Sequence, residues 1–150
     1  MTTTTAKYPR NGGFTLVEML VVLAIISLLA GVVVLNVAPQ LLAGSQGKAK
    51  AQIQVFSTAL NTYYAEQGRY PTQEQGLEAL VQKPVRGPIP ARYPENGYLS
   101  TRELPLDPWG HPYIYLIPGR QGEVFEILTY GADGEEGGSG GDEDLSSAHP

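Results

Sequence analysis

Two groups of carboxylates near the C-terminus have residue types and spacing that suit metal chemistry. The first group is Asp133, Glu135 and Glu136, and the second is Asp142–Asp144. A glycine-rich run separates them, so a loop folded back on itself could offer roughly six or more oxygen atoms to a hard cation. The spacing does not fit an EF-hand, because the fifth position counted from Asp133 is Gly137. By composition alone, the same acidic and glycine-rich tail is equally typical of a disordered segment.

Another carboxylate, Glu18, lies near the start of the most apolar part of the chain. The segment 14–35 contains few polar residues and, as a helix, is long enough to cross a hydrocarbon layer of roughly 30 Å. An ionisable residue in such a segment is costly unless it is paired, which makes Glu18 a candidate functional residue. Lys7 and Arg10 precede the segment, so we expect a cytoplasmic N-terminus and one exported domain.

Two simpler explanations of this segment stay open at this point. A secretory signal peptide also combines a basic start with an apolar core, and Ala38 and Ala43 are small residues of the kind found at its cleavage site. The segment could also be a plain membrane anchor in which the glutamate is incidental. The residues around Gly13 decide between these explanations.

Composition excludes several other classes of function. The chain has 150 residues, enough for one compact domain, and its net charge of −5 argues against a nucleic-acid partner. It has no cysteine, which excludes disulfides and thiolate metal sites. Asp107 and His111 are close in sequence, but the "DPWG" that begins at Asp107 is typical of a turn whose Trp109 contributes to the core. With two histidines and no serine in a nucleophile elbow, we predict that the protein is not an enzyme.

The first element expected to position these groups is a long helix. Pro39 should bend or interrupt it, and Gly44 and Gly47 should loosen the next turn. From 48 to 67 the helical period returns, and we expect Gly68 to end the helix. Its apolar positions recur at steps of three and four residues and predict one buried face: Ile53, Phe56, Leu60 and Tyr63.

The remainder predicts short elements packed against this helix. Thr72 is placed to cap a short helix with Leu77, Leu80 and Val81 on its buried side. The proline-rich stretch 85–107 is expected to be an irregular loop. Alternating residues at 113–117 and 123–130 predict an antiparallel hairpin that needs the helix as cover.

The junction "GGFTLVE" resembles the class III signal of type IV pilins and of the pseudopilins of type II secretion. The resemblance implies that a prepilin peptidase cuts between Gly13 and Phe14, methylates the new amino group of Phe14, and leaves the apolar segment in place. Glu18 lies about 6 Å along a helix from Phe14. We therefore expect the Phe14 amine, on the same or a neighbouring subunit, to pair with Glu18 and to set the register of assembly.

Three further motifs, "RYPTQEQGLEAL", "PENGYL" and "LPLDPWGHPYIYLIPG", resemble the protein G family, the major pseudopilins of type II secretion. This resemblance implies an α+β, type IV pilin-like fold in which a long N-terminal helix packs on a small antiparallel sheet. It implies a leader at 1–13, a transmembrane and filament-core helix at 14–43, and a periplasmic domain at 44–150 with an acidic loop at 131–150. The sequence departs from the family at Leu35, where proline is common, and lacks the aromatic residue that often closes the tail.

The same resemblance implies a function and a set of partners. The protein would be the main subunit of a periplasmic filament that drives folded proteins through an outer-membrane secretin. Its partners would be further copies of itself, minor pseudopilins, an inner-membrane assembly platform and the prepilin peptidase. A type IV pilin-like appendage subunit remains an alternative, although such pilins typically carry a C-terminal cysteine pair. Another is a membrane-anchored calcium-dependent binding protein that never polymerises.

The protein G family also has a calcium site in its C-terminal loop. Carried over by position, this implies side-chain ligands from Asp133, Asp142 and Asp144, with Glu143 as the competitor for Asp142. Tyr130 would contribute a backbone carbonyl oxygen. Calcium is therefore the expected cofactor.

Overall fold

The computed structural model describes residues 13–149, and within this range it does not describe the side chains of residues 31–42. Residues 1–12 of the predicted leader (1–13) and the side chains of residues 31–42 of the predicted span (14–43) lie outside this description. The chain divides into two units between Pro39 and Gln40, and each is considered separately below.

The first helix, α1, runs without a break from Leu16 to Gln67. Pro39 was expected to bend or interrupt this helix; it does not interrupt it, and Gly44 and Gly47 are helical as well. A proline removes one backbone hydrogen bond, and the helix continues because the bonds of the residues on either side remain. Gly68 follows the helix with φ of 72°, and its amide donates to the Tyr64 carbonyl at 2.8 Å, so the predicted end of the helix is confirmed.

In the first unit, apolar side chains of α1 are exposed on all sides between Phe14 and Leu29. Phe14 itself is 80% exposed. Within residues 13–30 and 43–149, whose side chains are described, no helix is long and apolar enough to cross a membrane.

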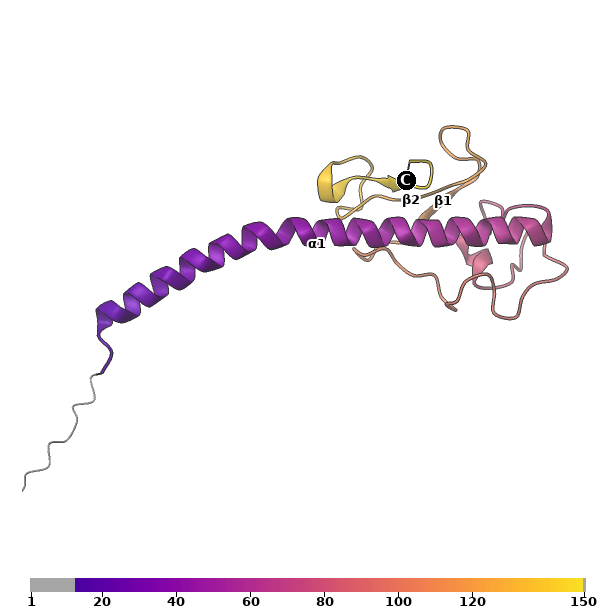
Figure 1. Cartoon of the computed structure of the whole chain (residues 1–150). Helices are drawn as coiled ribbons and strands as arrows, with labels where there is room; N and C mark the ends of the chain where they lie inside the picture. The colour runs from indigo at the N-terminus through magenta and orange to yellow at the C-terminus, as the bar shows by residue number, and fades with distance from the viewer. Residues whose placement is uncertain (1–12, 150) are drawn as a thin grey trace, which may run out of the picture. The chain divides into compact units, whose positions relative to one another are not determined.

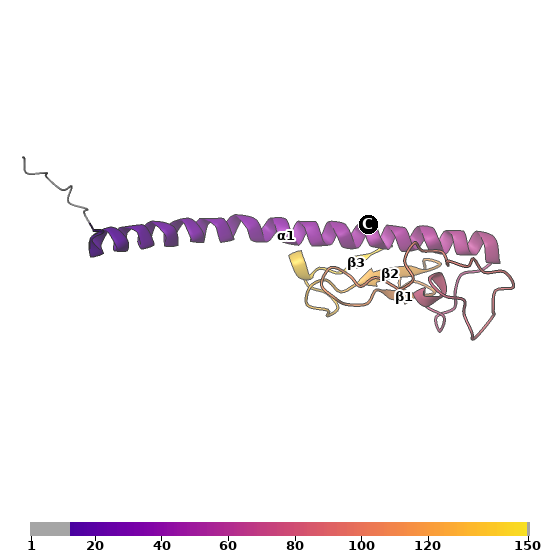
Figure 2. The same cartoon turned by 90° about the horizontal axis from the view of Figure 1, so that it is seen from below.

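The second unit is built on the second half of α1. The predicted apolar face is confirmed, since Ile53, Phe56, Leu60 and Tyr63 are all buried and belong to one core cluster. Figures 1 and 2 show the strands beside this part of the helix, where they supply the other side of the core. The strand residues in that core are Tyr115, Ile127 and Leu145.

The sheet has three antiparallel strands in the order β1-β2-β3: β1 (Ile114–Leu116), β2 (Glu126–Thr129) and β3 (Leu145–Ser146). The register pairs Tyr115 with Ile127 and Thr129 with Leu145. The predicted hairpin of β1 and β2 is confirmed, with shorter strands than the alternation indicated. β2 is the central strand of the sheet, and all four of its residues are buried.

Two short 3-10 helices complete the fold: η1 (Leu77–Leu80) and η2 (Gly140–Asp142). Leu77 and Leu80 are buried as predicted. Thr72, however, does not cap η1, whose preceding residue is Gly76. Instead, Thr72 and Gln75 exchange hydrogen bonds of 3.1 and 3.3 Å between side chain and backbone and close the turn before it. The stretch from 85 to 107 contains no helix or strand, as predicted.

Candidate functional site: the N-terminal junction and the acidic loop

The junction residues lie at the start of α1. Glu18 Oε2 accepts hydrogen bonds from the Thr15 amide at 2.8 Å and the Thr15 hydroxyl at 3.0 Å. The Glu18 amide donates in return to the Thr15 hydroxyl at 3.2 Å. This is a capping box, in which each side chain satisfies a backbone or hydroxyl donor at the helix N-terminus. In the single chain, the carboxylate of Glu18 is therefore already hydrogen-bonded.

Gly13 lies in open surroundings. Among the residues that the structure describes, a Cβ atom at this position would meet nothing within 4 Å. The fold of the single chain therefore gives no steric reason for a glycine before Phe14.

Within the predicted acidic loop (131–150), the part up to Asp144 is folded; below, the acidic loop means Tyr130–Asp144. Its two ends meet, because the Ala132 amide donates to the Gly141 carbonyl at 3.2 Å. A Cβ atom at Gly131, whose φ is 71°, would lie 2.8 Å from the carbonyl carbon of Asp142. Only glycine allows this approach without strain. The side chain of Gln46 in α1 donates to the Gly140 carbonyl, which holds η2 against the helix.

The loop brings the two acid-bearing segments together without gathering their carboxylates. Asp133 Oδ1 accepts from the Glu135 amide at 3.1 Å, and Asp144 Oδ1 accepts from the Gly137 amide at 3.1 Å. Asp142 is exposed, and Tyr130 is half-buried. Among the side chains that the structure describes, no three acidic or histidine residues lie close enough together to hold a metal ion.

An ion pair between the buried Glu126 and the exposed Arg120 beside this loop was not predicted. Glu126 of β2 is 2% exposed, and its carboxylate accepts from Arg120 Nη2 at 2.8 Å and from the Ser146 hydroxyl at 2.6 Å. Hydrogen bonding to Arg120 is the largest cause that lowers the pKa of Glu126 to about 2. Arg120 Nη1 also lies 3.4 Å from Glu136 Oε1. Through Arg120, Ser146 and Glu136, the carboxylate and its cation join three segments. These segments are the loop between β1 and β2, strand β3 and the first acid group.

The "DPWG" stretch is a turn, as predicted. The buried Asp107 carboxylate accepts from the amides of Trp109 at 3.0 Å and His111 at 2.8 Å, and from the hydroxyl of Thr129. Trp109 packs against the core. The hydrogen bonds of Asp107 therefore hold the turn together and attach it to Thr129, the last residue of β2.

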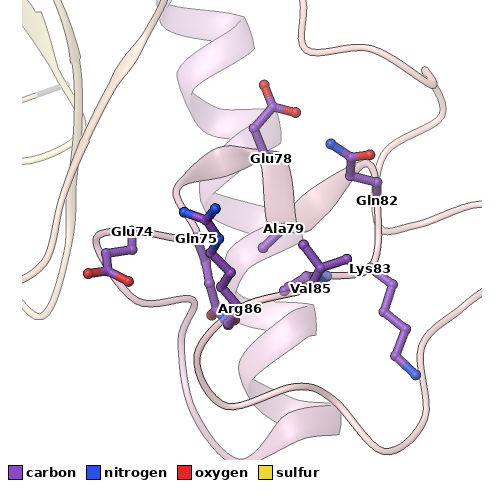
Figure 3. A pocket seen from close by; sticks show the side chains of 9 residues that line it. Glu74, Gln75, Glu78, Ala79, Gln82, Lys83, Val85 and Arg86 are labelled. Carbon is purple, nitrogen blue, oxygen red and sulfur yellow. The ribbon is translucent and has the colours of Figure 1, made fainter.

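A surface cavity of about 190 Å³ lies beside η1, which is below the roughly 300 Å³ typical of small-molecule sites. Figure 3 shows that Glu78, Gln82 and Lys83 extend outward around it. It contains none of the predicted site residues. Its lining consists of Glu74, Gln75, Glu78, Ala79, Gln82, Lys83, Pro84, Val85 and Arg86.

A long N-terminal helix on a small antiparallel sheet, preceded by a Gly-Phe junction, defines the pilin-like class of proteins. The prokaryotic N-terminal methylation motif matches residues 8–34. The model of the type II secretion system protein G family matches residues 36–148. The chain therefore belongs to the type II secretion system protein G family.

Relatives and a solved structure agree with this assignment. The type II secretion system core protein G of Pseudomonas aeruginosa is 43% identical over 138 residues, 92% of this chain and 95% of the relative. That of Vibrio cholerae is 43% identical over 94% of both chains. The crystal structure of the major pseudopilin from the type 2 secretion system of enterohaemorrhagic Escherichia coli matches with a TM-score of 0.59. It is 35% identical and covers 70% of this chain and 87% of its own.

Proposed function

We propose that this protein is a structural subunit of the type II secretion pseudopilus, a periplasmic filament that drives folded proteins through the outer-membrane secretin. The proposal rests on one observation: the same chain matches both the N-terminal methylation motif and the protein G family model. The exposed apolar surface of α1 between Phe14 and Leu29 supports it. Such a surface needs lipid before assembly and neighbouring helices within a filament.

The proposal includes an order of processing and a location. Residues 1–13 are a leader that the prepilin peptidase removes between Gly13 and Phe14, and the same enzyme methylates the Phe14 amine. The open surroundings of Gly13 support recognition by an external enzyme. Residues 14–43 anchor the protein in the inner membrane and form the filament core, while 44–150 lie in the periplasm. The partners are further copies, minor pseudopilins and the inner-membrane platform.

Glu18 acts in assembly. Removal of the leader creates a cationic amine at Phe14, next to the Thr15 amide that already donates to Glu18. A carboxylate held at this position by Thr15 is oriented toward the N-terminal end of α1. Pairing with the amine of the same or a neighbouring subunit compensates the charge in apolar surroundings and fixes the register of packed helices.

Calcium is the proposed cofactor of the acidic loop. The residues present fit it in donor chemistry, since Asp133, Asp142, Asp144 and the Tyr130 carbonyl offer only oxygen, which Ca²⁺ prefers. The pairing of Ala132 with Gly141 supports the fit, because it puts both acid segments at one place. Bound calcium would supply positive charge that joins the two segments, and it would stabilise the folded domain because it binds that form alone.

Coexpression with and without the prepilin peptidase tests the proposed function. Mass spectrometry should find that the processed protein begins at Phe14 with one added methyl group, and electron microscopy should find filaments only in that sample. Filaments from chains that keep the leader would contradict the proposal. A processed protein that forms no filaments would favour a non-polymerising binding protein, and surface-exposed long fibres would favour a type IV pilin-like appendage.

A further inference from the structure

His111 lies between the Asp107 turn and the acidic loop. Its Nδ1 atom is 3.3 Å from the carbonyl oxygen of Gly131 and 3.8 Å from Asp107 Oδ2. Because a carbonyl oxygen can only accept a hydrogen bond, Nδ1 is the donor in the contact with Gly131. One face of the loop is thus hydrogen-bonded to a side chain that the sequence had assigned to a simple turn.

The backbone of His111 is anchored to the sheet. The buried Asp107 carboxylate accepts from the His111 amide at 2.8 Å and also from the hydroxyl of Thr129 in β2. The Asp107 amide donates to the His111 carbonyl at 2.9 Å. The backbone of His111 is therefore fixed to the central strand, and its side chain projects from a rigid base.

On the other side, the ring meets the first turn of the loop. A Cβ atom built at Gly134 would lie 3.0 Å from the Cε1 atom of His111 and 3.2 Å from Nε2. Gly131 is in turn close to the backbone of Asp142 and Glu143. The turn 131–134 is therefore packed between His111 and the second acid segment.

We propose that His111 is the positioning residue of the acidic loop. It fixes the turn 131–134 by the bond to the Gly131 carbonyl, and so sets where the Tyr130 carbonyl and Asp133 lie relative to Asp142 and Asp144. The contacts described above support the effect of His111 on the position of the loop. Its effect on cation binding rests on the calcium site of the proposed function.

Three variants of the full chain, purified in detergent micelles, separate the ring from its hydrogen bond. His111→Ala removes both, His111→Phe keeps a ring without a donor, and His111→Asn keeps a donor close to the position of Nδ1. Hydrogen exchange without calcium should be faster at 132–144 in the Ala and Phe variants and unchanged in β1 and β2. The Asn variant should retain slow exchange. Calcium affinity, measured by titration calorimetry, should fall about tenfold in the Ala and Phe variants and recover in Asn.

Equal exchange at 132–144 in the original chain and in His111→Phe would overturn the proposal, as would an Asn variant as loose as the Phe variant. The Phe variant keeps the packing, so it decides the question if His111→Ala fails to fold. If the unaltered chain binds no calcium, the calcium site fails and the exchange data still decide the role of His111.

Discussion

Thr15 and Glu18 cap the N-terminus of α1 reciprocally, with the Glu18 carboxylate 2.8 Å from the Thr15 amide. The Glu18 carboxylate was expected to pair within the filament, and it already has a hydrogen-bond partner, Thr15, in the single chain. A cap and an assembly contact are compatible, because a carboxylate accepts several hydrogen bonds through its two oxygens. The two roles are separable by mutation.

Glu18→Ala should insert into membranes normally and yield few filaments, since the amine of Phe14 then has no carboxylate to meet. Thr15→Ala removes the cap at a cost of about 1 kcal/mol in helix stability and should still form filaments. Cell fractionation checks insertion, and electron microscopy checks filament yield. Normal yield from Glu18→Ala, or equal loss in both variants, would contradict a direct role of the carboxylate in assembly.

Arg120→Ala should destabilise the second unit, because it leaves the carboxylate of Glu126 buried without its cation. A fully buried pair broken in this way loses about 3–5 kcal/mol. We expect about 2 kcal/mol here, since the Arg120 side chain is 37% exposed and solvent screens part of the interaction. Denaturant unfolding of the full chain measures the loss. Arg120→Ala combined with Glu126→Gln should be less destabilised than the sum of the two, and strict additivity would contradict a direct pair.

The same pair predicts acid sensitivity. The pKa of Glu126 is lowered from 4.5 to about 2 in the folded protein, so the folded state favours the ionised form. Its stabilising contribution is fully present above about pH 4.5 and is lost as the pH falls toward about 2. The midpoint of thermal unfolding should fall as the pH is lowered across this range, and it should fall less steeply in Glu126→Gln. An identical slope in both proteins would assign the acid sensitivity to other carboxylates.

Calcium should raise the unfolding free energy by about 2.7 kcal/mol at a free concentration a hundredfold above the dissociation constant. Asp133→Asn, Asp142→Asn and Asp144→Asn should each reduce this gain. Glu143→Gln tests the competing assignment, and magnesium serves as the ion control because it requires a smaller, more regular site. Equal melting curves in calcium and in chelator would remove the calcium site.

Gly131→Ala should destabilise the acidic loop more than Gly140→Ala. Both glycines have left-handed φ, 71° and 64°, so each substitution carries about 1 kcal/mol of backbone strain. Only at Gly131 does the new methyl group meet other atoms, and overpacking adds about 1–3 kcal/mol. Urea unfolding compares the two variants. Equal losses would show that the two ends of the loop are not in contact.

The sequence was sufficient to predict those parts of the fold that follow from a local or repeated pattern. The stripe from Ile53 to Tyr63, the end of α1 at Gly68 and the β1–β2 hairpin follow from periodicity and turn residues, and the structure confirms them. The helix is not interrupted at Pro39, because the helical residues on both sides outweigh a single helix-breaking residue. The cap of Thr15 corresponds to the Thr-x-x-Glu pattern in the letters "TLVE".

Other parts depend on contacts between distant residues that no local pattern records. Strand β3 has only two residues and lies in a stretch whose composition is typical of disorder. The burial of Glu126 becomes evident only when Arg120 and Ser146 reach it from different segments. The contact of His111 with Gly131 is of the same kind. The ligand set of the acidic loop came from family resemblance, and its test remains the calcium experiment.

Strand β3 has one more consequence, for the timing of folding. Thr129 pairs with Leu145, and the Ser147 amide donates to the Ile127 carbonyl at 2.8 Å. A chain that becomes available from its N-terminal end cannot complete this sheet until residue 147 is free to pair. Until then β2 keeps one edge without a partner strand, and an unpaired strand edge is the place where another chain could add.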